Sequence, residues 1–328
     1  LFLFTIGLKR LRRRREAVQA EPCHYVDMFP FYDRLPFLLT DAQRRCVDEA
    51  LADMERGIPM NRLCQGDVGS GKTMVAAACV YFMVQNGRQA ALMAPTEILA
   101  KQHYAGLAPL LEGLGIRCDL LTGSTPAKTK RSIAEQLAAG EIDFAIGTHA
   151  LITEGIAYRD LGLVVTDEQH RFGVAQRARL WAKNAIVPHI LVMTATPIPR
   201  TLAMTLYGDL DVSVLDQLPP GRKPIRTLHI PDSALGRLYQ AVSTQIEAGS
   251  QAYFVFPLVK ESDKMALRNV ENEFLILQKV FPNYRIGMVH GRMKAVEKEE
   301  QMRLFTQGAT QILVATTVIE VGVNVPRA

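Results

Sequence analysis

The sequence predicts an α/β protein built from two tandem parallel-sheet domains. From Thr40 onward, amphipathic helical patterns alternate with short β-branched runs, which is typical of parallel strands joined by crossover helices. The alternation is interrupted by Leu-Asp-Gln-Leu-Pro-Pro-Gly-Arg-Lys-Pro at residues 215–224 and then restarts. A length of 328 residues also suits about two domains.

Six strands are expected in the first domain. Each candidate ends in a polar or glycine-containing loop, where open parallel sheets bind ligands. The candidates are residues 60–65, 89–94, 118–121, 144–147, 163–166 and 189–193, with a helix over 74–84 after the first of them.

The second domain repeats the pattern with strands over 226–230, 251–259, 284–289 and 311–315 and helices over 233–248, 266–280 and 294–307. We therefore divide the chain into a basic helical or tether segment (1–34), a first domain (35–214), a linker (215–226) and a second domain (227–328). The chain stops after a glycine-bearing loop, so we expect an incomplete second domain and a longer parent protein.

Composition excludes several classes of protein. Hydrophobic residues make up 48% and charged residues 22% of the chain, which argues against a disordered, collagenous or coiled-coil protein. The segment Leu1 to Leu8 is too short to span a membrane, and its basic run follows the apolar stretch, so neither an anchor nor a signal peptide is expected. The five cysteines form no CxxC pair, which favours reduced thiols in the cytoplasm.

The net charge of +5 suits a polyanionic partner. The basic run at residues 9–15 is either a contact for DNA phosphates or a solvated helix face. Six histidines, including His103 and His189, lack metal-ligand spacing and are interpreted as ordinary core or surface residues.

The strongest motif is Gly-Asp-Val-Gly-Ser-Gly-Lys-Thr at residues 66–73, which matches GxxxxGK[ST] between a strand and a helix. Its glycines let backbone N–H groups converge on phosphate oxygens at a helix N-terminus. Lys72 is expected to reach the β- and γ-phosphates and Thr73 to bind magnesium. The alternative is a chance glycine-rich turn. The cofactor-binding candidates here are Gly66, Asp67, Gly69, Ser70, Gly71, Lys72 and Thr73.

Asp167-Glu168-Gln169-His170 follows a strand that reads as buried. Asp167 is expected to hold the magnesium ion and Glu168 to act on the attacking water, so Lys72, Asp167 and Glu168 are the catalytic candidates. Two acidic residues after a strand can also be a solvated helix start, but their combination with the phosphate loop favours ATP hydrolysis with Mg²⁺.

These two motifs, together with Met-Thr-Ala-Thr-Pro-Ile-Pro-Arg-Thr-Leu at 193–202, resemble the core of the superfamily-two helicases. Asp-Glu-Gln-His-Arg-Phe-Gly-Val at 167–174 and His-Gly-Arg-Met-Lys at 290–294 resemble most closely the RecG family of bacterial DNA helicases. Further matches are residues 35–43, 94–100, 147–152 and 315–323. The transcription-repair coupling translocases are the close alternative. The resemblance implies RecA-like phosphate-loop NTPase domains, the second truncated at its C-terminus.

The resemblance also implies roles for residues outside the phosphate loop. Gln43 matches a glutamine that reads adenine, beside which Phe37 packs on the base, and His170 links ATP to the domain interface. An exposed helix glutamine is the plain alternative for Gln43. In the second domain the ATP-cleft candidates are Glu320, Gly322 and Asn324, the last standing where many relatives have aspartate.

A second set of residues resembles segments that grip the phosphates of a nucleic-acid strand, although ordinary helix caps are the alternative for each of those in the first domain. The candidates are Pro95, Thr96, Thr122, Gly123, Gly147, Thr148, Thr316 and Thr317. The segment Thr194-Ala-Thr196 is expected to couple the nucleotide state to this grip, or to be a plain strand-to-helix turn.

The function implied is an ATP-dependent DNA helicase or translocase motor that acts on forked or branched duplex DNA. We expect it to remodel stalled replication forks and recombination intermediates, as a monomer at the nucleoid of the bacterial cytoplasm. An RNA helicase, or a nucleotide-gated binding module without efficient turnover, stays open. The wedge domain and the arginine segment Gln-x-x-Gly-Arg-x-Gly-Arg of the family are not found in this chain, so slow turnover is expected of it.

Overall fold

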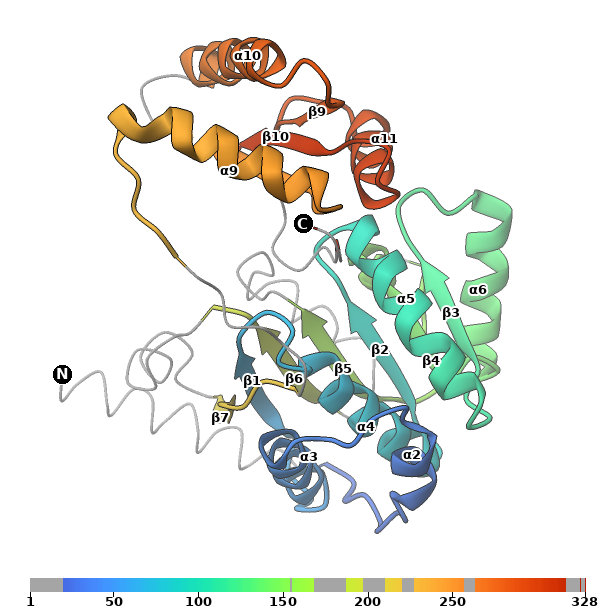
Figure 1. The fold of residues 1–328 in the computed structure, drawn as a ribbon. Coiled ribbons are helices and arrows are strands. Elements are labelled where there is room, and N and C mark those ends of the chain that lie inside the picture. The colour runs from blue at the N-terminus through green and yellow to red at the C-terminus, as the bar shows by residue number, and fades with distance from the viewer. Residues whose placement is uncertain are drawn as a thin grey trace, which may run out of the picture. The chain divides into compact units, whose positions relative to one another are not determined.

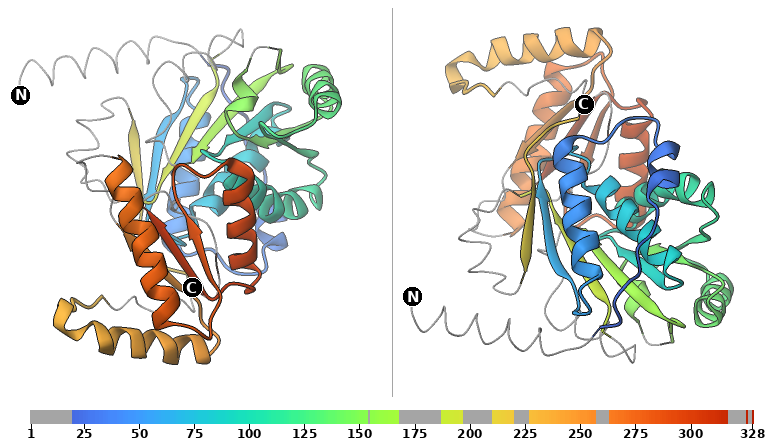
Figure 2. Two further views of the ribbon diagram at one scale, coloured as in Figure 1. Left: turned by 90° about the horizontal axis from the view of Figure 1, so that it is seen from above. Right: turned by 90° about the horizontal axis from the view of Figure 1, so that it is seen from below.

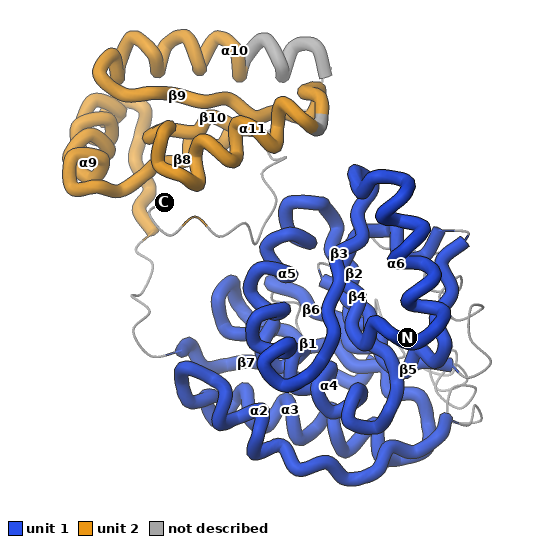
Figure 3. The backbone as a smooth tube through the Cα atoms, turned by 90° about the vertical axis from the view of Figure 1, so that its right-hand side faces the viewer, with its two compact units in different colours: residues 1–222 blue, residues 223–328 orange. Residues whose placement is uncertain are grey.

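The computed structural model describes residues 20–153, 155–167, 187–196, 210–219, 227–256, 263–316, 325 and 328. The chain divides into two compact units, residues 1–222 and 223–328 (Figure 3). Each unit contains a sheet in which all the strand pairings of the described residues are parallel. The predicted fold class, two tandem parallel-sheet domains, is therefore confirmed.

The first unit holds a seven-stranded sheet in the order β3-β4-β2-β5-β6-β1-β7 (Figure 1). Six of these strands lie within two residues of the segments predicted from sequence. The strands are β1 (Asn61–Gly66), β2 (Gln89–Met93), β3 (Cys118–Leu121), β4 (Phe144–Gly147), β5 (Leu161–Asp167), β6 (His189–Thr194) and β7 (Asp211–Leu215).

The first helices of this unit are α2 (Phe29–Arg34), α3 (Asp41–Met54), α4 (Lys72–Gln85) and α5 (Glu97–Glu112), of which α4 packs on β1, β2 and β5 and α5 packs on β3 and β4. Helix α3 packs against α4, and α4 packs against α5 (Figures 1 and 2). Helix α4 is buried on all sides from Val75 to Met83, as an apolar helix with no polar stripe must be. The helix that begins at the phosphate loop is thereby fixed in the centre of the unit.

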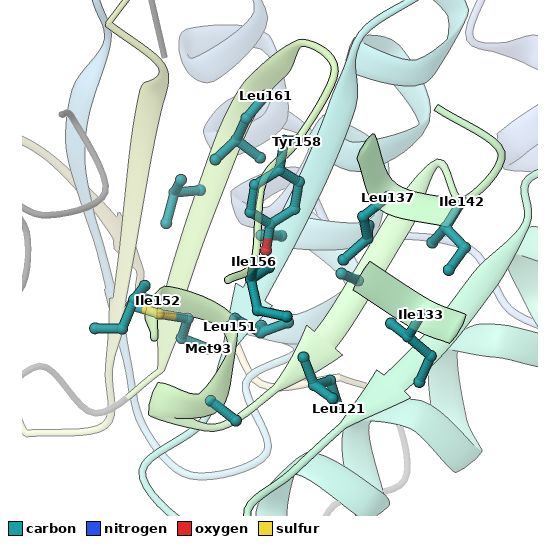
Figure 4. Close-up of a cluster of buried hydrophobic side chains, with 14 residues drawn as sticks. Met93, Leu121, Ile133, Leu137, Ile142, Leu151, Ile152, Ile156, Tyr158 and Leu161 are labelled. Atoms are coloured by element: carbon teal, nitrogen blue, oxygen red, sulfur yellow. The ribbon is translucent and has the colours of Figure 1, made fainter. Parts of the chain in front are cut away.

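A second layer covers the opposite face of the same strands. Helix α6 (Ala127–Ala139) and the 3₁₀ helix η1 (His149–Ile152) pack on Met93 of β2 and Leu121 of β3 (Figure 4). Because side chains alternate along a strand, the other strand residues serve the α4 and α5 face. Burial on both faces explains why these strands read as continuous apolar runs.

Strand β7 was not predicted, and it pairs with β1 at the edge of the sheet. It reads Asp-Val-Ser-Val-Leu, a run too short and too polar to predict a buried strand. In the structure Ser213 is buried, whereas Val214 is 41% exposed. A buried polar cluster holds it in place. Arg62 of β1 contacts Asp53 at 2.7 Å, Glu49 at 2.9 Å and the hydroxyl of Ser213 at 2.7 Å.

The second unit contains a three-stranded sheet in the order β8-β10-β9. Its strands are β8 (Ala252–Phe256), β9 (Ile286–Val289) and β10 (Ile312–Thr316), and its helices are α9 (Leu235–Glu247), α10 (Asp263–Val280) and α11 (Ala295–Thr306). Helices α9 and α10 share an apolar core with Ile312 and Val314. Phe305 of α11 packs on Tyr253 of β8, with ring centroids 4.7 Å apart.

The strand predicted over residues 226–230 is wrong for the described residues 227–230, which form no strand. Leu228 is 62% exposed, and the segment runs into Pro231, which has no backbone N–H for a ladder. Within the part of the chain that the structure describes, this alternation of apolar residues pairs with no strand. Among the residues that the structure describes, no helix is long and apolar enough to cross a bilayer.

Candidate nucleotide-binding site

The phosphate loop joins the end of β1 to the start of α4. Gly69 and Gly71 have φ values of +74° and +89°, in the left-handed region that favours glycine. A Cβ atom at position 71 would also collide with the side-chain amide of Gln43. Glycine is therefore required at Gly71 both by backbone conformation and by close packing.

The side chain of Lys72 is hydrogen-bonded to the backbone of the same loop. The ammonium of Lys72 donates to the carbonyl oxygens of Gly66 at 2.7 Å and Asp67 at 2.9 Å. Ser70 is fully buried, and its hydroxyl has no hydrogen-bond partner within the described part of the chain. Thr73, in the first turn of α4, is partly buried.

These features fit a bound polyphosphate. Consecutive loop N–H groups at the N-terminus of a 14-residue helix form an anion site, and a flexible lysine adds a positive charge. The buried Ser70 hydroxyl is a further unmatched polar group at the same loop. The residues of the loop are thus chemically suited to a nucleoside triphosphate.

Gln43 contacts the loop from α3. Its Nε2 donates to the Ser70 carbonyl at 2.8 Å, and its Oε1 accepts the Thr40 N–H at 2.9 Å. Thr40 in turn caps α3 by accepting the Gln43 N–H, which completes a capping box. The alternative of an exposed helix glutamine is wrong because Gln43 is 2% exposed. Adenine recognition by Gln43, with the 49% exposed Phe37 on the base, stays a prediction.

Asp167 lies at the same edge of the sheet as the phosphate loop. It ends β5, which is separated from β1 by β6 alone, so the ends of β5 and β1 are about 10 Å apart. Thr194 ends the intervening strand, is 1% exposed, and accepts the Thr196 N–H at 3.2 Å. We call this edge, where the strands of the first sheet end, the carboxyl edge.

Asp167 has a close partner that sequence reasoning missed. Nε2 of His103 in α5 lies 2.7 Å from Oδ2 of Asp167. A histidine between Gln102 and Tyr104 gives no motif, and 64 residues separate His103 from Asp167. The only sequence signal is a polar residue on the apolar stripe of α5.

The strand-contact candidates of the first domain occupy the other half of the carboxyl edge. Pro95 and Thr96 follow β2, Thr122 and Gly123 follow β3, and Gly147 and Thr148 end or follow β4. In the sheet order these three strands lie together, beyond β5. The carboxyl edge therefore carries nucleotide candidates on one side and strand-contact candidates on the other.

Several of these residues also have local structural tasks. The hydroxyl of Thr96 caps α5 by accepting the Leu99 N–H, and that of Thr148 caps η1 by accepting the Ala150 N–H. A Cβ atom at Gly147 would collide with the Leu121 carbonyl of the neighbouring strand. The helix-cap alternative is thus correct for both threonines, and nucleic-acid contact by them stays a prediction.

Of the remaining predicted site residues, one lies in the described part of the chain. Thr316 ends β10, is 1% exposed, and has a hydroxyl with no partner within the described residues. Glu168, Gln169, His170, Thr317, Glu320, Gly322 and Asn324 lie outside the described residues.

The two units of the chain match two families of helicase domains. Residues 40–205 match the family described as DEAD/DEAH box helicase, and residues 233–328 match the helicase conserved C-terminal domain. The chain belongs to the DEAD/DEAH box helicase family. The first match covers the phosphate loop and Asp167, and the second covers the described α-helices α9, α10 and α11 and strands β8, β9 and β10.

Within this helicase family the expected resemblance to RecG is confirmed. The chain is 49% identical over 99% of its length to the ATP-dependent DNA helicase RecG of Synechocystis, and 48% identical over 99% to that of Bacillus subtilis. It spans 40% and 48% of these two relatives. A solved structure of RecG bound to a three-way DNA junction matches 100% of this chain and 43% of that chain, at 40% identity and a TM-score of 0.84.

Proposed function

We propose that this helicase-family chain is the ATP-driven motor of a protein that remodels stalled replication forks and branched recombination intermediates. The observation that carries the proposal is the division of the carboxyl edge. A phosphate loop and a carboxylate lie at the ends of β1 and β5, and the strand-contact candidates lie at the ends of the adjoining β2, β4 and β3. Similarity to a RecG structure that holds a three-way DNA junction supports branched DNA as the substrate.

In this proposal the nucleotide is ATP with Mg²⁺. The loop N–H groups and Lys72 bind the phosphates, Thr73 and Asp167 hold the magnesium ion, and Glu168 orients water. Lys72 must exchange its two loop carbonyl partners for phosphate oxygens, which a four-carbon side chain allows without moving the backbone. Hydrolysis of bound ATP supplies the free energy for movement.

The proposed grip on the strand is not specific for sequence. Threonine hydroxyls and backbone N–H groups at helix starts contact phosphate oxygens without reading bases. Asp167 ends β5, and Thr96 follows β2, which pairs with β5 in the same sheet. A shift of Asp167 on nucleotide binding can therefore be passed to Thr96 through two adjoining strands. Branch recognition then depends on further parts of the parent protein.

The test is ATP hydrolysis by the chain with three nucleic acids at equal nucleotide concentration: a forked duplex, a linear duplex and single-stranded RNA. We expect slow hydrolysis that both DNA duplexes stimulate and the RNA does not. Stimulation by RNA alone would identify an RNA helicase. Saturable ATP binding without turnover under any of these conditions would identify a nucleotide-gated binding module, and either result overturns the proposal.

A further inference from the structure

His103 and Asp167 form a buried contact that no sequence motif predicts. Their side chains are 8% and 13% exposed, and Nε2 of His103 lies 2.7 Å from Oδ2 of Asp167. A carboxylate oxygen only accepts, so the Nε2–H of His103 donates. A charge-assisted hydrogen bond of this length, shielded from water, holds the carboxylate in one orientation.

Helix α5 gives His103 a rigid position. The helix buries Leu99, Ala100, His103 and Leu107, which follow the spacing of one face. A polar side chain on a buried stripe requires a partner, and the last residue of β5 supplies it. The imidazole has only two torsions and is 8% exposed on the buried face of α5, so it is a preorganised donor.

The first residue of α5 is hydrogen-bonded to the strand-contact loop that follows β3. The carboxylate of Glu97, in the first turn, accepts the backbone N–H of Ser124 at 2.9 Å and its hydroxyl at 2.5 Å. Ser124 follows Thr122 and Gly123 in the loop after β3. One helix thus contacts Asp167 at its middle and a strand-contact loop at its start.

We propose that His103 is a positioning residue for the divalent cation that accompanies the nucleotide. Its imidazole occupies Oδ2 of Asp167 and leaves Oδ1 for the cation or its bound water. Hydrogen-bonded supports of metal-binding carboxylates typically contribute about 10-fold to 100-fold in metal affinity. The inference rests on the proposed function, because it takes Asp167 as the magnesium carboxylate.

The experiment measures binding and needs no turnover. The full chain is titrated with a fluorescent, non-hydrolysable ATP analogue without metal and then with increasing Mg²⁺, for wild type, His103→Ala and His103→Gln. We expect equal metal-free affinity and, in His103→Ala, an Mg²⁺ midpoint raised about 10-fold. The amide Nε2 of glutamine stands close to the position of the histidine Nε2, so His103→Gln should recover most of the loss.

His24→Gln is the matched control, since His24 is exposed and its side chain has no hydrogen bond among the described residues. An unchanged Mg²⁺ midpoint in His103→Ala overturns the proposal, as does a His103→Gln variant no better than alanine. If His103→Ala fails to fold, the proposal is tested by the Mg²⁺ midpoint of His103→Gln and by the protonation of the two ring nitrogens in the wild-type protein.

The ring nitrogens are read by ¹⁵N NMR of histidine-labelled, metal-free protein. A proton on Nε2 of His103 supports the contact, and a ring protonated on Nδ1 alone overturns it. These readouts are independent of nucleic acid. A chain that binds Mg²⁺ and nucleotide through His103 but ignores DNA would refute the proposed function and leave this inference intact.

Discussion

The side-chain amide of Gln43 donates to the Ser70 carbonyl of the phosphate loop at 2.8 Å. The oxygen of the same amide accepts the Thr40 N–H that precedes α3. One buried side chain therefore completes a helix cap and braces the loop that is proposed to bind phosphate. Adenine recognition, if Gln43 performs it, must use the remaining N–H or a rearrangement of these bonds.

Replacing Gln43 by alanine should reduce stability and loosen the phosphate loop. The loss of two hydrogen bonds by a buried residue predicts a fall of about 2 kcal/mol in the free energy of unfolding, measured by urea titration. Gln240→Ala, at an exposed position of α9, is the control. Affinities for ATP and GTP separate the two roles: an equal loss for both nucleotides contradicts adenine recognition.

Lys72→Ala should abolish tight nucleotide binding or turnover while the chain stays folded. The variant removes one positive charge from the phosphates, and loss of a single donor to developing charge commonly costs on the order of 10²-fold in rate. Helix α4 should persist because its buried residues from Val75 to Met83 are untouched. ATP hydrolysis and circular dichroism are the measurements, with the exposed Lys279→Ala as control. A rate equal to wild type would remove Lys72 from the proposed site.

Glu97→Ala should weaken the response to DNA more than the binding of nucleotide. It removes the acceptor for the N–H and hydroxyl of Ser124, so the loop after β3 loses its attachment to α5. Hydrogen bonds to a charged group contribute about 1.5–3 kcal/mol, and partial exposure reduces this, so we expect DNA affinity to fall about 10-fold or less. Fluorescence anisotropy with a labelled fork measures it.

The control for Glu97→Ala is Glu135→Ala, which breaks an exposed ion pair of α6 with Arg131. Exposed pairs of this kind contribute little, so this control should bind the fork as wild type does. Equal fork affinity in Glu97→Ala and wild type would show that the loop after β3 is held without Glu97 or does not contact the strand.

The sheet was predictable because its strands are buried on both faces. Runs such as Leu-Gly-Leu-Val-Val-Thr before Asp167 are apolar up to their last residue, and each is followed by a loop with polar or glycine residues. Strand β7 could not be predicted in this way because it lies at the edge of the sheet, where Val214 is exposed. Its Ser213 is held by a hydrogen bond from Arg62, and not by apolar packing. The segment 227–230 has the alternation of a strand but pairs with none of the described strands.

The phosphate loop was predictable because its chemistry is local, within eight consecutive residues. The contacts that support it are not local. Gln43 meets Ser70 across 27 positions, and His103 meets Asp167 across 64. Such pairs depend on which strands adjoin in the sheet and on which face a helix buries, and neither follows from a single motif.

His189 should make stability depend on pH. It is fully buried, its Nδ1 accepts the Met60 N–H at 3.0 Å, and its Nε2 has no partner within the described residues. Burial, with a smaller contribution from the charge of Arg88, lowers the pKa of His189 from 6.5 to about 4. The folded protein therefore holds a neutral ring in a pH range where the unfolded chain binds a proton.

The sign follows from this difference in proton binding. Above about pH 6.5 both states carry a neutral ring and stability is full, and as the pH falls from 6.5 toward 4 the unfolded state gains the proton first. At pH 4.5 the loss should reach about 2–3 kcal/mol. His189→Asn, whose Oδ1 stands close to the position of the histidine Nδ1 and can accept the Met60 N–H but does not titrate, should lose less stability between pH 7.5 and 4.5 in urea titrations. His24→Asn, at an exposed site, should retain the wild-type slope. A wild-type slope in His189→Asn as well would contradict the assignment, because another group would then carry the pH dependence.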